Sequence, residues 1–497
     1  MPWWRDAVVY QIYPRSFADA DGDGVGDLDG IRRHLDHVQS LGADAIWVSP
    51  IYPSPMADNG YDVSDYCDID PVFGDLATFD ALLAEAHARG LKLLLDWVPN
   101  HTSDRHPWFV ESRSSRDNPK RDWYYWRDGR DGDPSKPPNN WLAAFGGIAW
   151  TWDDTTSQWY LHNFLPQQPD LNWNNPQVEE AMHATLRFWL DRGVDGFRMD
   201  VVHMIGKDPA LPDAPAAEAK TNRVGFNDYP GTHALLRGIR DVLDSYPGDR
   251  VAVGEVNLRD TSRLATYYGD VNAKGGDELT LVFNFNSLRA GWDASAWAEL
   301  IDTVEREMGP DRWPTWVLSN HDVRRLRTRL DGSEKRARAM AVLLLSLRGT
   351  PFLYAGEELG LQDAVVPKDE ALDPGGRDGC RAPIPWTPDP PHGWTGTRPW
   401  LPFPPDPEHL NASTESHDPA SMLAHYCRLL TDRRASPALQ HGSLRRQEMP
   451  DGVLAFTREC GEDRRTVVVN FRESDVEVDV GGEAMTVPAE TATVVAR

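Results

Sequence analysis

The stretch Gly196-Phe197-Arg198-Met199-Asp200 decides the fold of this chain, because it has the form of a short strand that ends in a carboxylate. Three further segments have the same form, namely Leu91–Asp96, Val251–Glu255 and Trp316–Asp322. Short apolar runs separated by helical patterns indicate parallel strands covered by helices. The C-terminal ends of such strands meet on one face when the sheet closes into a barrel. We therefore expect these acidic positions to lie close together.

The same alternation of strand and helix signals extends along most of the chain and predicts an α/β fold, a (β/α)8 TIM barrel. The eight strands that we expect cover residues 8–13, 43–48, 91–96, 194–199, 251–255, 279–283, 315–318 and 351–354. The main helices that we expect cover residues 28–40, 76–89, 176–192, 232–244 and 421–433.

Two stretches interrupt this alternation. Residues 102–170 are too long for an ordinary loop and predict an inserted domain, and residues 363–410 form a second irregular insertion rich in Pro and Gly. Near the C-terminus, short β-type runs with turn signals between them predict a small antiparallel β domain. The predicted organisation is a barrel over residues 1–101 and 171–435, an insertion over 102–170, and the β domain over 436–497.

The composition excludes several classes of function. The chain has 497 residues, enough for two or three domains, and a formal net charge of −26 that argues against nucleic acid or an anionic membrane as a partner. The N-terminus has no signal-peptide pattern, and no stretch approaches the ~20 apolar residues of a membrane span. The four cysteines show no metal-binding spacing. We expect a soluble, cytoplasmic protein, and the sequence leaves its oligomeric state open.

The four acidic segments, in this order, resemble the signature regions of the α-amylase superfamily, glycoside hydrolase family 13. The resemblance implies that Asp200 is the nucleophile, Glu255 the general acid/base and Asp322 a stabiliser of the oxocarbenium-like state, with Asp96 supporting Arg198. Retaining glycosidases hold their two reacting carboxyl groups about 5–5.5 Å apart. Arg198 and Asp200 point to the same side of a strand, so we expect the guanidinium to lower the pKa of Asp200. The alternative is that these two residues form only a structural ion pair.

The resemblance also implies a blind substrate pocket. Asp58 would bind the terminal glucose and Tyr61 would stack on its ring, although Asn59-Gly60 between them also reads as a simple turn. An acidic residue that closes the pocket there gives exo-action. Arg377 and Arg381 both belong to a segment typical of α-glucosidases, and we expect Arg381 to pair with Asp58. The resemblance further places these residues at the substrate: His101, Phe164, Gln168, Arg198, Val201 and His321.

A metal loop is predicted near the N-terminus. Residues 19–27 alternate Asp with small residues like the first half of an EF-hand, but Gly30 stands where the twelfth-position Glu should be. Oxygen ligands at alternate positions suit Ca²⁺ (calcium) or Mg²⁺, and a plain acidic turn is the alternative. The resemblance implies a structural metal here, with the ligands Asp19, Asp21, Asp23, the carbonyl of Val25, and Asp27.

These observations predict a retaining, exo-acting α-glucosidase that releases glucose from short α-glucosides through a covalent glucosyl-enzyme, without an organic cofactor. Valine at position 201 is associated with α-1,6 substrates in the resembling enzymes, but the sequence leaves α-1,4 and α-1,6 preference open. One alternative is a transglucosylase, or an isomerase of sucrose or maltose, on the same scaffold. A non-catalytic, transporter-associated relative is the other, and the retained carboxylates argue against it. Residues 203–230 are a candidate lid over the pocket.

Overall fold

The computed structural model describes residues 2–215, 227–272, 274–396 and 398–496, so part of the candidate lid lies outside the described residues. Eight parallel strands form the central sheet, in the order β11-β8-β7-β3-β2-β1-β13-β12. This architecture confirms the predicted barrel. The strands are β1 (Val9–Ile12), β2 (Ala45–Val48), β3 (Lys92–Trp97), β7 (Gly196–Met199), β8 (Val251–Gly254), β11 (Leu281–Val282), β12 (Thr315–Val317) and β13 (Thr350–Tyr354).

Side-chain hydrogen bonds connect the two end strands of this sheet. The hydroxyl of Thr315 in β12 donates to the carbonyl of Val282 in β11 at 2.9 Å and accepts the backbone N–H of Asn284 at 3.2 Å. Thr315 is fully buried, so these bonds are shielded from water. The barrel is therefore closed at this seam by a threonine.

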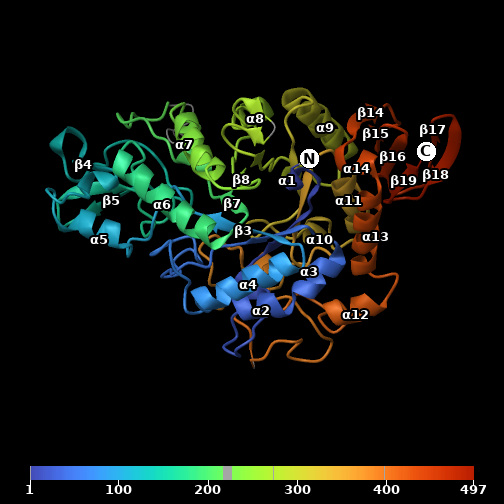
Figure 1. Ribbon diagram of the computed structural model, residues 1–497, viewed down its shortest axis with the longest axis horizontal. Helices are drawn as coiled ribbons and strands as arrows, with labels where there is room; N and C mark the ends of the chain where they lie inside the picture. Colours follow the sequence, from blue (N-terminus) through green and yellow to red (C-terminus); the bar gives the residue numbers. More distant parts are fainter. Residues whose placement is uncertain (1, 216–226, 273, 397, 497) are drawn as a thin grey trace.

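Helices cover the outside of the barrel (Figure 1). The principal ones are α2 (Leu28–Arg33), α3 (Leu35–Leu41), α4 (Leu76–Ala88), α6 (Pro176–Arg192), α7 (Thr232–Asp244), α9 (Ala294–Met308), α11 (Glu334–Ser346) and α13 (Met422–Ala435). Shorter ones are α1 (Trp3–Asp6), α5 (Pro107–Ser114), α8 (Thr261–Thr266), α10 (Leu326–Arg329), α12 (Ala412–His417) and α14 (Pro437–His441). The predicted bounds of α6 hold because Asn175 caps its start and Gly193, at φ 102°, ends it.

Two smaller β structures flank the barrel on opposite sides (Figure 1). Between β3 and α6, the chain forms an antiparallel sheet of β4 (Trp126–Arg127), β6 (Gln158–Leu161) and β5 (Trp150–Asp153). The C-terminal part contains β14 (Ser443–Gln447), β15 (Val453–Cys460), β16 (Asp463–Asn470), β17 (Val476–Val480), β18 (Glu483–Val487) and β19 (Ala492–Ala496), all in antiparallel pairs. β9 (Val271–Asn272) and β10 (Gly275–Gly276) make a small separate hairpin.

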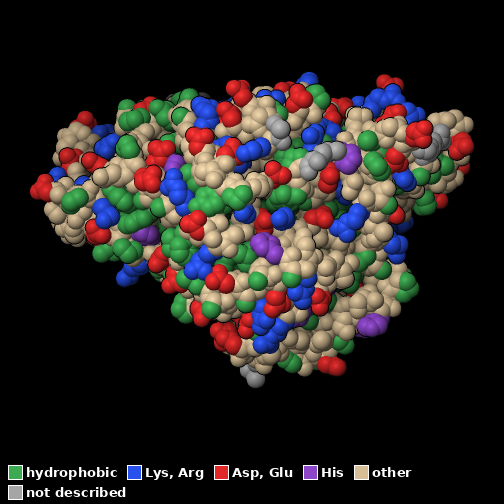
Figure 2. Space-filling view, viewed as in Figure 1, with side chains coloured by type: hydrophobic (Ala, Val, Ile, Leu, Met, Phe, Trp, Pro, Cys, Tyr) green, Lys and Arg blue, Asp and Glu red, His purple; other side chains and the backbone are tan. Residues whose placement is uncertain are grey.

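On the face shown in Figure 2, acidic and basic side chains are interspersed with each other and with hydrophobic ones. Among the helices of the described residues, none combines the length and the apolar composition needed to cross a membrane.

Candidate active site

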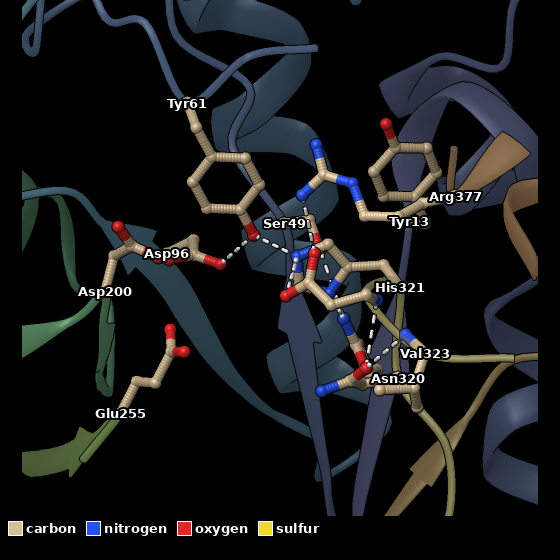
Figure 3. Close-up of polar contacts among 12 residues, drawn as sticks. Tyr13, Ser49, Tyr61, Asp96, Asp200, Glu255, Asn320, His321, Val323 and Arg377 are labelled. Carbon is tan, nitrogen blue, oxygen red and sulfur yellow. Dashed lines mark hydrogen bonds and ion pairs between the residues drawn. The ribbon is translucent and has the colours of Figure 1, made fainter. Parts of the chain in front are cut away.

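The predicted catalytic carboxylates lie at the C-terminal ends of the barrel strands. Asp200 follows β7 and Glu255 follows β8, while Asp322 lies in the loop after β12. Backbone hydrogen bonds extend the strand ladder to the first two: the N–H of Asp200 donates to Trp97 at 2.8 Å, and that of Glu255 to Met199 at 2.8 Å. Their positions are therefore set by the sheet itself. Figure 3 shows Asp200 and Glu255 facing the same space from neighbouring strands.

Arg198 in β7 binds three carboxylates at once. Its Nη1 donates to Asp96 Oδ1 at 2.7 Å and to Asp200 Oδ1 at 2.8 Å, and its Nη2 donates to Glu255 Oε2. The guanidinium is 1 % exposed. One buried cation therefore orients the predicted nucleophile and the predicted acid/base relative to each other.

The electrostatic effect on Asp200 differs from the expected one. Burial raises the pKa of Asp200 well above its ordinary value; the attraction of Arg198 opposes this, and repulsion from Glu255 and Asp96 adds to the rise. Burial also raises the pKa of Asp96 to about 6. Arg198 does lower the pKa of Asp200, but burial outweighs this attraction, so the expectation of a net low pKa for Asp200 is wrong.

Asp322 has the opposite character. Although its burial raises the pKa, the neighbouring His321, Arg377 and Arg381 hold the pKa of Asp322 below its usual range. Arg377 donates to Asp322 Oδ1 at 2.9 Å and Arg381 to the same oxygen at 3.2 Å. Asp322 is therefore kept ionised, as a group that stabilises developing positive charge must be.

Arg377, not Arg381, pairs with Asp58, which corrects the sequence-based expectation. Arg377 Nη2 donates to Asp58 Oδ1 at 2.6 Å, and Gln168 Nε2 donates to the other carboxylate oxygen at 3.1 Å. Arg381 instead donates to the backbone carbonyl of His321 at 2.8 Å and is fully buried. Arg377 precedes a short 3-10 turn and Arg381 ends it, and only the first lines the pocket.

A cavity of about 350 Å³ lies over these groups. Eight of the predicted site residues line it: Asp58, Tyr61, His101, Phe164, Asp200, Val201, Glu255 and Asp322. Four lie outside its lining and are almost fully buried: Gln168, Arg198, His321 and Arg381. The wall also contains Arg377, the less favoured of the two candidate arginines, and four residues that were not predicted: Ala144, Phe145, Asn257 and Gly375.

Only part of this additional wall has a sequence signal. Asn257 follows Glu255 by two residues, a spacing that could have marked it as a neighbour. Phe145, by contrast, belongs to the insertion of residues 102–170, and its ring lies 5.5 Å from the Arg377 guanidinium. No periodicity around Phe145 predicts that contact.

The two histidines of the site are neutral donors or acceptors, not cations. Burial lowers the pKa of His101 to about 3, and burial likewise lowers that of His321 to about 3. His101 Nε2 lies 3.1 Å from the carbonyl of Tyr61, whose ring stacks on His321 at 5.4 Å.

The N-terminal acidic loop brings three of its predicted metal ligands together. Carboxylate oxygens of Asp19, Asp21 and Asp27 lie within 4.8 Å of one another. Asp23 lies outside this group, and its carboxylate accepts the N–H of Val25 at 2.7 Å. Three converging carboxylates fit a divalent cation, because they would otherwise repel one another.

The family model described as "Alpha amylase, catalytic domain" matches residues 11–442. A "Probable alpha-glucosidase" of Rhizobium meliloti is 45% identical over 95% of this chain and 90% of its own length. An "Oligo-1,6-glucosidase" of Parageobacillus thermoglucosidasius is 40% identical over 95% of this chain and 91% of its own length. Among solved structures, the alpha-glucosyl transfer enzyme XgtA has a TM-score of 0.93 at 40% identity, covering 100% of this chain and 99% of that one. An isomaltulose synthase variant from Erwinia rhapontici NX5, in complex with its natural substrate sucrose, has a TM-score of 0.93 at 33% identity, with coverage of 100% and 99%.

Proposed function

This chain belongs to the α-amylase catalytic-domain family, and from that premise we propose that its pocket is the active site of an α-glucosidase. The enzyme releases single glucose units from the non-reducing end of short α-glucosides and retains the anomeric configuration. One observation carries the proposal: Asp200 and Glu255 share the Arg198 guanidinium beneath a cavity lined by the Asp58–Arg377 ion pair.

The reaction needs one protonated and one ionised carboxyl group at the glycosidic bond. Glu255 donates its proton to the leaving oxygen while Asp200 attacks the anomeric carbon, so that the carbon–oxygen bond breaks and a glucosyl ester forms. Glu255 then takes a proton from water, which attacks the same carbon and releases Asp200. Two displacements at one centre leave the configuration unchanged. Asp322, held ionised by two arginines, stabilises the positive charge that develops on the sugar.

Exo-action is supported by how Asp58 is held. Its two carboxylate oxygens are fixed separately, one by Arg377 and the other by Gln168. Oxygens in fixed positions can recognise the hydroxyl groups of a terminal sugar, and a wall there leaves no passage for a longer chain.

We also propose that the loop of residues 19–27 binds a structural divalent cation, Ca²⁺ or Mg²⁺. The convergence of Asp19, Asp21 and Asp27 supports this proposal. The cation would neutralise those carboxylates and stabilise the loop. A cytoplasmic location stays a prediction from the sequence.

The proposed function is tested by hydrolysis of maltose, isomaltose, sucrose and trehalose, followed by NMR of the first anomer released. We expect α-glucose as the first product from at least one disaccharide, and loss of turnover by more than about 1,000-fold in Asp200→Asn, because an amide cannot form the ester. β-Glucose as the first product, rapid midchain cutting of soluble starch, or activity of Asp200→Asn within tenfold of wild type would contradict the proposal. New glucosidic linkages as the main product at high donor concentration would instead identify a transglucosylase.

A further inference from the structure

Both ring nitrogens of the buried His321 have side-chain partners, of which Figure 3 labels Tyr61. Gln11 Nε2, from β1, lies 2.7 Å from His321 Nδ1, and the Tyr61 hydroxyl lies 2.6 Å from His321 Nε2. Gln11 and His321 are each 1 % exposed, so water does not compete for these contacts. Gln11 has no role in the mechanism described above.

The directions of these hydrogen bonds follow from their far end, at Asp96. Asp96 Oδ2 accepts the indole N–H of Trp47 at 3.2 Å and the hydroxyl of Tyr61 at 3.0 Å. Because the Tyr61 proton is used there, the Tyr61 oxygen must accept from His321 Nε2–H. A neutral imidazole carries only one proton, so its Nδ1 must then accept, and an amide N–H must be the donor.

We propose that Gln11 is a positioning residue, which fixes His321 in the Nε2–H tautomer and thereby sets the direction of the hydrogen bonds that run through Tyr61 to Asp96. This inference rests on the proposed function of the same site. This series of hydrogen bonds is connected to the reacting groups, because Asp96 binds the guanidinium of Arg198 at 2.7 Å. Arg198 in turn holds both reacting carboxylates.

The opposite tautomer would disturb the site at two points. Its unprotonated Nε2 would face Asp322 Oδ2, 3.5 Å away, and two lone pairs would repel each other. The Tyr61 hydroxyl would also turn to donate to Nε2 and would leave Asp96. Asp96 would then lose one of the groups that hold it against Arg198.

The imidazole has a crowded electrostatic environment. The charged and titratable groups that act on it or touch it are Asp322, Arg198, Arg377, Arg381, Tyr13, Tyr61 and Cys380. Burial disfavours an imidazolium, and the three guanidiniums, which outnumber the one carboxylate, disfavour it further. The choice between the two neutral tautomers is therefore left to the hydrogen-bond partners.

Two substitutions of similar size test this assignment. Gln11→Met removes the N–H donor, and we expect kcat to fall about tenfold at every pH, with KM within threefold, because Gln11 does not line the pocket. Gln11→Glu replaces the donor with an acceptor. At high pH the introduced carboxylate requires Nδ1–H, whereas at low pH the protonated carboxyl group donates to Nδ1 and keeps Nε2–H, so we expect the kcat optimum to move to lower pH only in this variant.

Ser49→Ala is the matched control, because it removes the other partner of Gln11 Nε2, at 3.3 Å, and leaves the bond to His321. We expect its kcat to stay within twofold of wild type. The tautomer is read directly from ¹⁵N NMR of histidine-labelled protein, with His321→Asn for assignment and melting temperatures as a check of folding.

We expect the Nε2–H pattern in wild type and in Ser49→Ala, a mixture of the two tautomers in Gln11→Met, where only the Tyr61–Asp96 end still selects between them, and Nδ1–H in Gln11→Glu at high pH. Nδ1–H in wild type, or a wild-type tautomer in Gln11→Met, would overturn the assignment. The NMR readout needs no substrate, so it separates failure of this inference from failure of the proposed function.

Discussion

Arg377 is the residue that joins the closed end of the pocket to the catalytic machinery. Its Nη2 binds Asp58 at 2.6 Å and its Nη1 binds Asp322 at 2.9 Å. Lysine has a single ammonium group and cannot bridge two carboxylates in this way. Breaking a buried ion pair costs about 3–5 kcal/mol, so we expect Arg377→Lys to lower kcat/KM on maltose or isomaltose by at least about 100-fold.

Arg464→Lys is the control for this substitution, because Arg464 makes an exposed ion pair with Glu459 in the C-terminal β domain. We expect its kcat/KM to stay within twofold of wild type. A loss below threefold in Arg377→Lys would contradict the bridging role.

Val201, next to the nucleophile, combines backbone strain with a place in the pocket wall. Its φ is 33°, in the left-handed region that β-branched residues rarely occupy. The side chain lines the cavity and borders the leaving sugar in the proposed mechanism. A change of one methyl to one hydroxyl is worth about 1–3 kcal/mol of discrimination. We expect Val201→Thr to raise the maltose-to-isomaltose ratio of kcat/KM, as measured on both disaccharides side by side; an unchanged or lower ratio would show that another residue sets the preference.

The role of a site residue could be predicted where it follows from strand geometry. It could not be predicted where it depends on a partner that is distant in the sequence. Asp200 and Glu255 end strand-like runs, so their shared face could be inferred from the sequence. The choice between Arg377 and Arg381 could not, because it depends on how one short turn is oriented against Asp58. The net pKa shift of Asp200 depends in the same way on burial, which no local pattern reports.

At the scale of elements, the barrel strands were predictable because they are continuous buried runs. The predicted helix over residues 28–40 is instead two helices, which meet at His34, where the backbone leaves the helical region at φ −112° and ψ 12°. The strands β14 and β18 were missed, because each is mostly exposed and shows no clear alternation of apolar and polar residues. Such edge strands are defined by the strand beside them more than by their own residues.

The closure of the barrel between β11 and β12 depends on the hydroxyl of Thr315. Valine has the same shape without the hydroxyl, so Thr315→Val would leave buried backbone groups of Asn284 and Val282 without this partner. An unmet buried hydrogen bond costs about 1–3 kcal/mol. We expect a lower free energy of unfolding by that amount, measured in urea. Thr486→Val, at an exposed position of β18, is the control; equal stability of the two variants would contradict a role of Thr315 in closure.

At the scale of the whole molecule, the metal loop connects parts of the chain that are distant in sequence. The Thr395 hydroxyl donates to the carbonyl of Asp19 at 2.9 Å, and the N–H of Trp400 donates to the carbonyl of Gly24 at 2.8 Å. The loop after β1 is therefore bound to the second insertion, the same insertion that carries Arg377. The sequence predicted the acidic pattern, but it could not show what the loop holds in place.

A cation in this loop should stabilise the fold more than it affects the chemistry, because its proposed ligands do not line the active-site cavity. A ligand at 100 times its Kd stabilises the folded state by about 2.7 kcal/mol, and its removal should lower the melting temperature by several degrees. We expect chelation to produce this shift in wild type, while the folded enzyme keeps most of its kcat. In Asp21→Asn, which removes one ligand charge, the shift should shrink or vanish, and Asp133→Asn, at an exposed turn of the other insertion, should keep it. An unchanged wild-type melting temperature after thorough chelation, together with no metal in elemental analysis, would show that the loop is a plain acidic turn.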